Sequence, residues 1–171
     1  MIRIEKPTIT DVPKLTALAK ETFIQSHGHS AAAEDIKAYM DLHYTEAVFA
    51  NELNEPNNIY HLVYYKDELV GFSKIVYNQA IKAIDQSNIT KLERIYILDN
   101  FHGLGIAKTV FDFNVELAKG NKQRGIWLFT WTENKRAIAF YEKLGFVIIG
   151  EHSFKISETH YNPNWQYYLG F

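Results

Sequence analysis

The sequence contains no cysteine among its 171 residues. That absence excludes disulfide bonds, thiolate metal sites and cysteine nucleophiles, and it is compatible with the reducing cytoplasm, where we expect the protein. The chain also lacks an apolar run of about 18 residues, the length of a transmembrane helix. Its first residues, MIRIEKPTITDVP, become charged before a signal-peptide core can form. We expect a soluble protein without a membrane partner.

Positive charge is not in excess either. The 18 Lys and Arg residues stand against 20 Asp and Glu, for a net charge of −2. Binding to nucleic acid needs clustered Lys and Arg, so we expect no such partner. Internal repeats, low-complexity segments and Gly/Ser/Pro-rich linkers are also missing. With 47% hydrophobic residues, the chain is long enough for one substantial core, which predicts a single domain over residues 1–171.

Hydrophobic periodicity predicts the elements of the first half of the chain. A strand over residues 1–6 leads into a helix that begins at Thr10 or Asp11. Residues 33–54 predict one or two helices with a break near Tyr44–Thr45. Two aromatic and β-branched runs over residues 59–77 then predict a hairpin. Its polar turn is expected at Lys66–Glu68.

The second half alternates strands and helices. A strand over residues 89–98 is expected to place Leu92, Arg94 and Tyr96 on one side and Glu93, Ile95 and Ile97 on the other. A helix then runs from residue 106 to a C-cap at Gly120, and a short helix over residues 134–144 ends at Gly145. Strands are expected at residues 126–131, 146–151 and 165–171. This order predicts an α+β (mixed α/β) fold whose sheet is parallel at its centre.

The segment DNFHGLGIAKTVFDF, residues 99–113, is typical of a backbone that binds an anion. It does not fit a P-loop, because His102 and Ala107 replace the required glycines, and it does not fit a dinucleotide fingerprint, because Lys108 replaces the third glycine. A helix that begins after Gly103 and Gly105 has unpaired N–H groups and a positive dipole end, which suit a pyrophosphate without a metal. A simple turn that reverses the chain is the alternative.

Two motifs resemble the GCN5-related N-acetyltransferase (GNAT) superfamily. Residues 102–107, HGLGIA, resemble its acetyl-CoA loop, (Q/R)-x-x-G-x-(G/A), with His102 in the place of Gln or Arg. Residues 134–146, NKRAIAFYEKLGF, match N-x-x-A-x-x-(F/Y)-Y-x-x-x-G-F completely. The chain looks most similar to the bacterial PaiA-type branch, which acetylates spermidine and spermine. This resemblance implies a mixed, mostly antiparallel sheet of about seven strands, with a parallel central pair and about four flanking helices.

The resemblance further implies acetyl transfer from acetyl-CoA to a small-molecule primary amine, with a polyamine such as spermidine as the candidate acceptor. Direct attack in a ternary complex is expected, since no cysteine exists to carry the acetyl group. The resemblance makes Glu93 the base, directly or through water, and Tyr141 the general acid. The plainer alternatives are a carboxylate paired with Lys91 or Arg94, and a core tyrosine beside Phe140. A non-catalytic acetyl-CoA-binding regulator is the alternative function.

The expected binding residues fall into two sets. The cofactor set, which includes amides near Ile97 and Leu98 at a divergence of the central strands, consists of Ile95, Ile97, Leu98, His102, Gly103, Leu104, Gly105, Ile106, Ala107, Lys108, Asn134, Ala137, Tyr141 and Lys143. The acceptor set consists of Phe23, His27, Tyr39 and Glu93.

Three further expectations concern partners and charge. Residues 21–60 contain seven Asp and Glu against the single base Lys37, which favours a cationic acceptor if this segment covers the acceptor site. His27 and His29 form a H-x-H pair, for which we prefer a substrate-proximal or surface loop over a metal site, and either histidine could relay a proton. The aromatic C-terminal strand is compatible with pairing across a homodimer.

Overall fold

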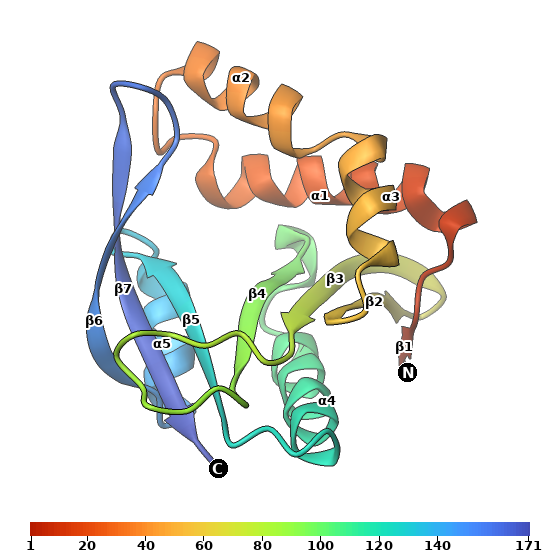
Figure 1. Cartoon of the computed structure of the whole chain (residues 1–171). Coiled ribbons are helices and arrows are strands. Elements are labelled where there is room, and N and C mark those ends of the chain that lie inside the picture. Colours follow the sequence, from red (N-terminus) through yellow and green to blue (C-terminus); the bar gives the residue numbers. More distant parts are fainter.

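Seven strands form one sheet in the computed structural model, which describes all 171 residues (Figure 1). The strand order is β1-β2-β3-β4-β5-β7-β6, and only the central pair, β4 and β5, is parallel. The mixed, mostly antiparallel sheet is therefore confirmed. The strands are β1 (Ile2–Glu5), β2 (Asn58–Tyr65), β3 (Glu68–Val76), β4 (Thr90–Ile97), β5 (Gly125–Trp131), β6 (Val147–Lys155) and β7 (Tyr161–Gly170).

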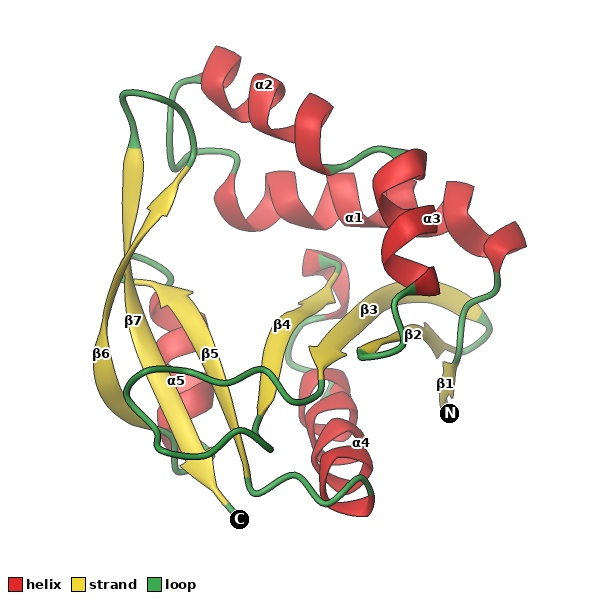
Figure 2. Ribbon diagram, in the orientation of Figure 1, coloured by secondary structure: helices red, strands yellow, loops and turns green.

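Helices cover both faces of the sheet (Figure 2). Three of them lie on one face, and two lie on the other, so the structure has five α-helices where about four were expected. The predicted break at Tyr44–Thr45 is confirmed, because the Thr45 side chain caps a new helix by accepting a hydrogen bond from the Val48 amide. The helices are α1 (Val12–His27), α2 (Ala33–His43) and α3 (Glu46–Asn54) on the first face, and α4 (Ile106–Gly120) and α5 (Lys135–Lys143) on the second.

Separate hydrophobic clusters fill the two sides of the sheet. Leu15, Phe49 and Phe72 are completely buried between the sheet and helices α1–α3. Ile126 and Val110 are equally buried beneath α4 and α5. Each such side chain contributes roughly 1.5–3 kcal/mol by leaving water. These clusters fix the sheet rigidly between two helical layers. None of the helices has the length and hydropathy needed to cross a membrane.

A bulge in β4 overturns the expected alternation of its side chains. Arg94 lies opposite Lys74 on β3, but Leu92 lies opposite Ile75, so Glu93 is an extra residue on β4. The extra residue reverses which face the next side chains occupy. Leu92 consequently packs in the cluster beneath α4 and α5, whereas Tyr96 packs against the cluster beneath α1–α3. The expectation that Leu92 shares a face with Arg94 is wrong.

Strands β4 and β5 separate soon after they begin. They pair only at Thr90 with Ile126 and at Lys91 with Trp127, and beyond these pairs their ends diverge (Figure 1). The expected divergence of the central strands is confirmed. Backbone groups of β4 that would have bonded to β5 are thus left without a strand partner.

Two smaller expectations are wrong. Gly120 is the last residue of helix α4 and Asn121 is its C-cap, so the C-cap lies one residue beyond the expected one, and the positive φ of 59° that follows belongs to Lys122. Strand β7 lies between β5 and β6, so its central residues have both edges occupied. It cannot extend a sheet into a second copy of the chain, because its backbone groups already bond within the sheet.

Candidate active site

The loop before α4 presents unpaired amides to a cavity. Gly103 and Gly105 have positive φ angles of 80° and 76°, and Gly105 is the N-cap of α4. The Thr109 amide makes the first helical bond, to the carbonyl of Gly105, so the three preceding amides have no intrahelical partner. A Cβ atom built on either glycine meets nothing within 4 Å. The open space therefore lies directly against a backbone rich in donors, at the positive end of the α4 dipole.

A cavity of about 500 Å³ extends from this loop to α5. Leu104 and Leu98 do not line it: Leu104 is half exposed, and the Leu98 amide already donates to the carbonyl of Val70 at 2.9 Å. The Lys108 ammonium is paired with Asp112 across one helical turn. The expected cofactor residues that do line the cavity are Ile95, Ile97, His102, Gly103, Gly105, Ile106, Ala107, Lys108, Asn134, Ala137, Tyr141 and Lys143.

The diverging end of β4 offers two amides to the gap. Since alternate backbone groups of a strand point to opposite edges, the bond from Leu98 to β3 means that Ile95 and Ile97 point toward the gap. The carbonyl of Ile97 points there too, because it contacts the His102 ring. The backbone of Ile97 faces the gap as expected. The amide of Leu98 does not, because it donates to Val70 on β3, so the expectation for Leu98 is wrong.

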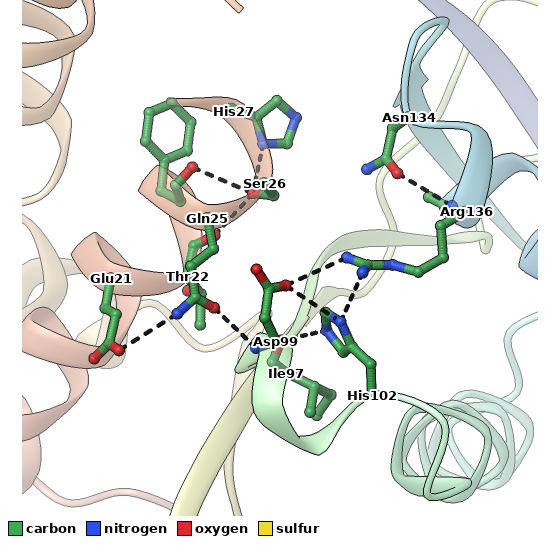
Figure 3. A network of polar contacts seen from close by, with 12 residues as sticks. Glu21, Thr22, Gln25, Ser26, His27, Ile97, Asp99, His102, Asn134 and Arg136 are labelled. Atoms are coloured by element: carbon green, nitrogen blue, oxygen red, sulfur yellow. Dashed lines mark hydrogen bonds and ion pairs between the residues drawn. The ribbon is translucent and has the colours of Figure 1, made fainter. Parts of the chain in front are cut away.

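His102 holds the loop in place through a polar network (Figure 3). Its Nε2 lies 2.7 Å from the carbonyl of Ile97, and Arg136 of α5 lies 2.6 Å from its Nδ1. Arg136 only donates, so Nδ1 accepts and Nε2 carries the proton. The Asp99 amide donates to Gln25 of α1 at 2.9 Å, and the Asp99 carboxylate lies 3.7 Å from Arg136. The network ties the loop to α1 and α5 at the edge of the cavity.

A second cavity, of about 340 Å³, lies under helices α1–α3. All four expected acceptor residues line it: Phe23, His27, Tyr39 and Glu93. Five residues line both cavities, namely Ile95, Tyr96, Asn134, Ala137 and Tyr141. The two cavities therefore meet at the start of α5 and at Tyr141.

Tyr141 is buried at this junction. Its burial, assisted by the nearby hydroxyl of Tyr96, raises the pKa of its phenol well above the ordinary value. No protein group hydrogen-bonds to this hydroxyl. The helix that carries it begins at Asn134, whose side chain accepts from the Ala137 amide at 3.2 Å. At neutral pH the phenol is a proton donor without a partner in the protein.

Glu93 faces the second cavity and is held by two ammonium groups. Lys74 donates to its carboxylate at 2.7 Å, and Lys91 lies at 3.5 Å. Burial acts to raise the pKa of Glu93, but the charges of Lys91, Lys74 and Arg94 outweigh it and leave the pKa lowered. The side chain is consequently a carboxylate at neutral pH.

Lys74 connects Glu93 to a second carboxylate. Its ammonium lies 3.0 Å from Glu52 of α3, which also accepts a hydrogen bond from Tyr60. Arg94 lies 3.8 Å from Glu52 and donates to the Tyr60 hydroxyl at 3.0 Å. Buried charges of this kind are stable only when paired, so the cluster locks α3 onto the sheet.

The acidic stretch of residues 21–60 does not line the acceptor cavity as expected. Of its carboxylates, only Glu52 does so, and its partners Lys74 and Arg94 already neutralise it. The other carboxylates lie at the outer surface of the helices or at their ends. Charge in this stretch therefore gives little support to a polycationic acceptor.

The histidines of this region are packed against aromatic rings. His27 stacks on Phe23, with ring centroids 5.3 Å apart, and His29 contacts Trp131. Burial lowers the pKa of His27 to about 4, so its imidazole is neutral at pH 7. No group of three or more His, Cys, Asp or Glu side chains is arranged to hold a metal ion.

Comparison with known proteins decides the family. The sequence model of the acetyltransferase (GNAT) family matches residues 17–146. The chain belongs to this family. An uncharacterised N-acetyltransferase of Lactobacillus delbrueckii subsp. lactis is 25% identical to this acetyltransferase over 157 residues, covering 92% of this chain and 91% of the relative. An uncharacterised N-acetyltransferase of Mycobacterium tuberculosis is 28% identical over 154 residues, or 90% and 94% of the two chains.

Solved structures show the same fold. The PaiA N-acetyltransferase of Thermoplasma acidophilum, in complex with coenzyme A, superposes with a TM-score of 0.79 at 18% identity, over 100% of this chain and 99% of that one. A streptothricin acetyltransferase described as putative, from Bacillus anthracis, in complex with acetyl-CoA, gives a TM-score of 0.59 at 28% identity, over 69% and 65%. The acetyltransferase fold is thus confirmed, and these two related structures hold coenzyme A or acetyl-CoA.

Sequence reasoning missed several residues that line the two cavities. The sequence pattern indicates Arg94 only as a partner of Glu93 and predicts Thr130 and Trp131 in a buried strand, yet all three line the smaller cavity. Arg136 was an unassigned position inside a motif, yet it contacts His102. Glu93 and Arg94 could have indicated the site, because an acid and a base inside an apolar strand require partners when they are buried.

Proposed function

We propose that this acetyltransferase acetylates a small primary amine bound in the cavity under α1–α3, by direct attack within a ternary complex. The observation that supports this most is the junction of two cavities at Tyr141, one beside the α4 amides and the other beside Glu93. Direct attack is further supported by the complete absence of cysteine, the residue that would most readily carry an acetyl group.

The residues of the larger cavity fit acetyl-CoA. The glycines leave open space against the unpaired amides of Ile106, Ala107 and Lys108, which suit a diphosphate. The amides of Ile95 and Ile97 suit the amide-rich pantetheine arm and the thioester oxygen. Acetyl-CoA supplies an acetyl group on a thioester, and transfer forms a C–N bond as the C–S bond breaks. A preorganised donor at the thioester oxygen is worth about 3 kcal/mol by analogy with oxyanion holes.

Glu93 and Tyr141 manage the protons of this reaction. An amine reacts only when unprotonated, and an ammonium of pKa about 10 must first lose a proton near pH 7. We assign that proton to the Glu93 carboxylate, directly or through water, from which it passes to solvent because the pKa of Glu93 is low. The Tyr141 hydroxyl, protonated at neutral pH, donates its proton to the departing thiolate. The nitrogen loses its second proton to water as the amide forms, and Tyr141 is reprotonated from solvent.

A coupled assay tests the proposed function. The purified protein is incubated with acetyl-CoA and amines of three kinds, namely polyamines including spermidine, amino acids and short peptides, and the release of free thiol is measured. We expect release with at least one primary amine above the rate with acetyl-CoA alone. A thermal shift with coenzyme A but no turnover on any amine would instead support a non-catalytic acetyl-CoA-binding protein.

The pH dependence tests the role of Glu93. Because the pKa of this carboxylate is lowered, it is ionised throughout the neutral range, and kcat/KM is expected to rise with pH only as the acceptor ammonium loses its proton. Glu93→Gln should lower kcat by about 100-fold without changing the shape of the profile. Glu116→Gln, an exposed carboxylate on α4 paired with Lys119, is the matched control. An inflection between about pH 6 and 8 that disappears in Glu93→Gln would contradict this assignment.

A further inference from the structure

The β4 bulge places an acid and a base side by side on the wall of the acceptor cavity. Glu93 and Arg94 are consecutive, and consecutive residues of a regular strand point to opposite faces. Here both reach the face covered by α1–α3: Glu93 bonds to Lys74, which also pairs with Glu52 of α3, and Arg94 bonds to Tyr60. Both line the smaller cavity.

Arg94 is fixed in position but has unused donors. Its guanidinium lies over the rings of Tyr44 and Phe49, 5.3 Å from each centroid, and only one of its nitrogens hydrogen-bonds, to Tyr60 at 3.0 Å. Its side chain is 12% exposed, and that exposure faces the cavity it lines. A guanidinium has five N–H donors in a rigid fork that matches a carboxylate. The remaining N–H donors of Arg94 are therefore available to an acceptor atom of the ligand.

The charges around the cavity leave one cation in excess. The cluster contains the three cations Lys74, Lys91 and Arg94 but only the two carboxylates Glu52 and Glu93. Lys74 and Arg94 are largely buried while Lys91 is partly exposed, and of these cations Lys91 and Arg94 line the cavity, so the excess charge is only partly solvated and favours a counter-ion. An additional carboxylate balances the cluster, whereas a polycation adds to the imbalance. The cavity charge thus favours an acceptor that carries an anionic group.

The rest of the cavity wall suits a compact, apolar body. Aromatic rings from helices α1, α2 and α5 and from strands β4, β5 and β6 line it, and its volume of about 340 Å³ accommodates a small molecule. Besides Tyr96 and Tyr141 at the junction of the two cavities, the rings are those of Phe23, Tyr39, Tyr44, Phe129, Trp131 and Phe154.

We infer that the acceptor is an amino acid with an apolar side chain, whose amino group faces Glu93 and whose carboxylate binds Arg94. An α-amino acid carries a cation and an anion on one carbon atom, and the bulge arranges an anion and a cation on adjacent residues in the complementary sense. This inference rests on the proposed function, since it names the class of amine that the acetyltransferase modifies. It makes Arg94 a residue that determines specificity.

Matched acceptors test the inference on the unaltered protein. Phenylalanine, tyrosine, tryptophan, leucine and methionine are each compared with their carboxamides, and spermidine is included. At least one amino acid is expected to exceed its amide in kcat/KM by about 10- to 100-fold, the value of a charge-assisted hydrogen bond. If every amide reacts as well as its acid, or if spermidine reacts best, the inference is wrong while the proposed function stands. No thiol release with any amine contradicts the proposed function itself.

A substitution and a binding measurement identify the residue responsible. Arg94→Met is expected to raise KM for the preferred amino acid at least about 10-fold while changing KM for its amide less than about threefold. Arg124→Met, which removes an exposed cation between α4 and β5, is the control and should leave both unchanged. Calorimetric titration of the amino acid into the protein with coenzyme A should show the same loss of affinity. An equal loss for acid and amide would assign Arg94 a purely structural role. Should Arg94→Met not fold, the comparison of acids with amides in the unaltered protein still decides.

Discussion

Tyr141→Phe is expected to lower kcat by about 100-fold or more while changing the affinity for coenzyme A less than about twofold. The hydroxyl lies where the two cavities meet and has no partner in the protein, so its removal breaks no internal hydrogen bond. Burial keeps its pKa above the ordinary value, and the group that is lost is therefore a protonated donor. The chemical step should suffer, and folding should not.

Steady-state kinetics and a thermal shift with coenzyme A separate these effects. Tyr77→Phe is the matched control, because its hydroxyl contacts the Leu117 carbonyl and Asn121 outside both cavities. That variant should keep full turnover and lose about 1 kcal/mol of unfolding free energy. A Tyr141→Phe enzyme with unchanged kcat would show that another group protonates the thiolate. Parallel losses of kcat and coenzyme A affinity would point instead to a distorted α5.

The sequence predicted most of the fold because local patterns and the fold agree in this chain. The hairpin turn at Lys66–Glu68 is confirmed by positive φ angles at Lys66 and Asp67. Gly145, which follows the C-cap Leu144 of α5, has a positive φ of 92°, as the residue after many helix C-caps does. Helix α4 shows the limit of such signals. The sequence pattern predicts Gly120 as its C-cap, but Gly120 is its last helical residue and Asn121 is the C-cap, a difference of one residue that is usual at helix ends.

The bulge at Glu93 could not be predicted, because a register shift depends on the partner strand. The run of β4 alternates normally when it is read alone, and only its pairing with Lys74 and Ile75 shows that one residue is extra. That single residue decides which side chains reach the acceptor cavity. The alternation of β4 alone therefore cannot indicate that Glu93 and Arg94 reach the same cavity. The family resemblance indicates Glu93, but nothing in the alternation of the strand indicates Arg94.

The charge of the acceptor cavity was misjudged for a related reason. The composition includes every carboxylate of residues 21–60, but only Glu52 lines the cavity, where it is paired with cations from other elements. Lys74 lies 22 residues after Glu52 and 19 before Glu93 in the chain, yet it pairs with both. Long-range ion pairs of this kind follow from the topology of the sheet, so the sequence stretch alone could not indicate them.

The loop before α4 gives a second prediction, which concerns cofactor binding. Gly105→Val is expected to lower the affinity for coenzyme A at least about 10-fold. Valine is strained at the φ of 76° that Gly105 adopts, by roughly 1–2 kcal/mol, and its side chain enters the space beside the α4 amides. The methyl groups of the valine would occupy the space in which the diphosphate is proposed to bind. Glu93 and Tyr141 are untouched, so saturating acetyl-CoA should restore much of the turnover.

Gly120→Ala in the same helix separates this effect from a general weakening of α4. Gly120 does not have a positive φ, and a Cβ built on it meets nothing within 4 Å, so alanine should stabilise the helix by about 0.5–1 kcal/mol and leave coenzyme A binding unchanged. Calorimetric titration of coenzyme A and the circular dichroism of each free variant are the measurements. If Gly105→Val is folded and binds coenzyme A with full affinity, the α4 amides are not the diphosphate site. The positive end of α4 would then serve only the local turn, and the larger cavity would need a different anchor for the cofactor.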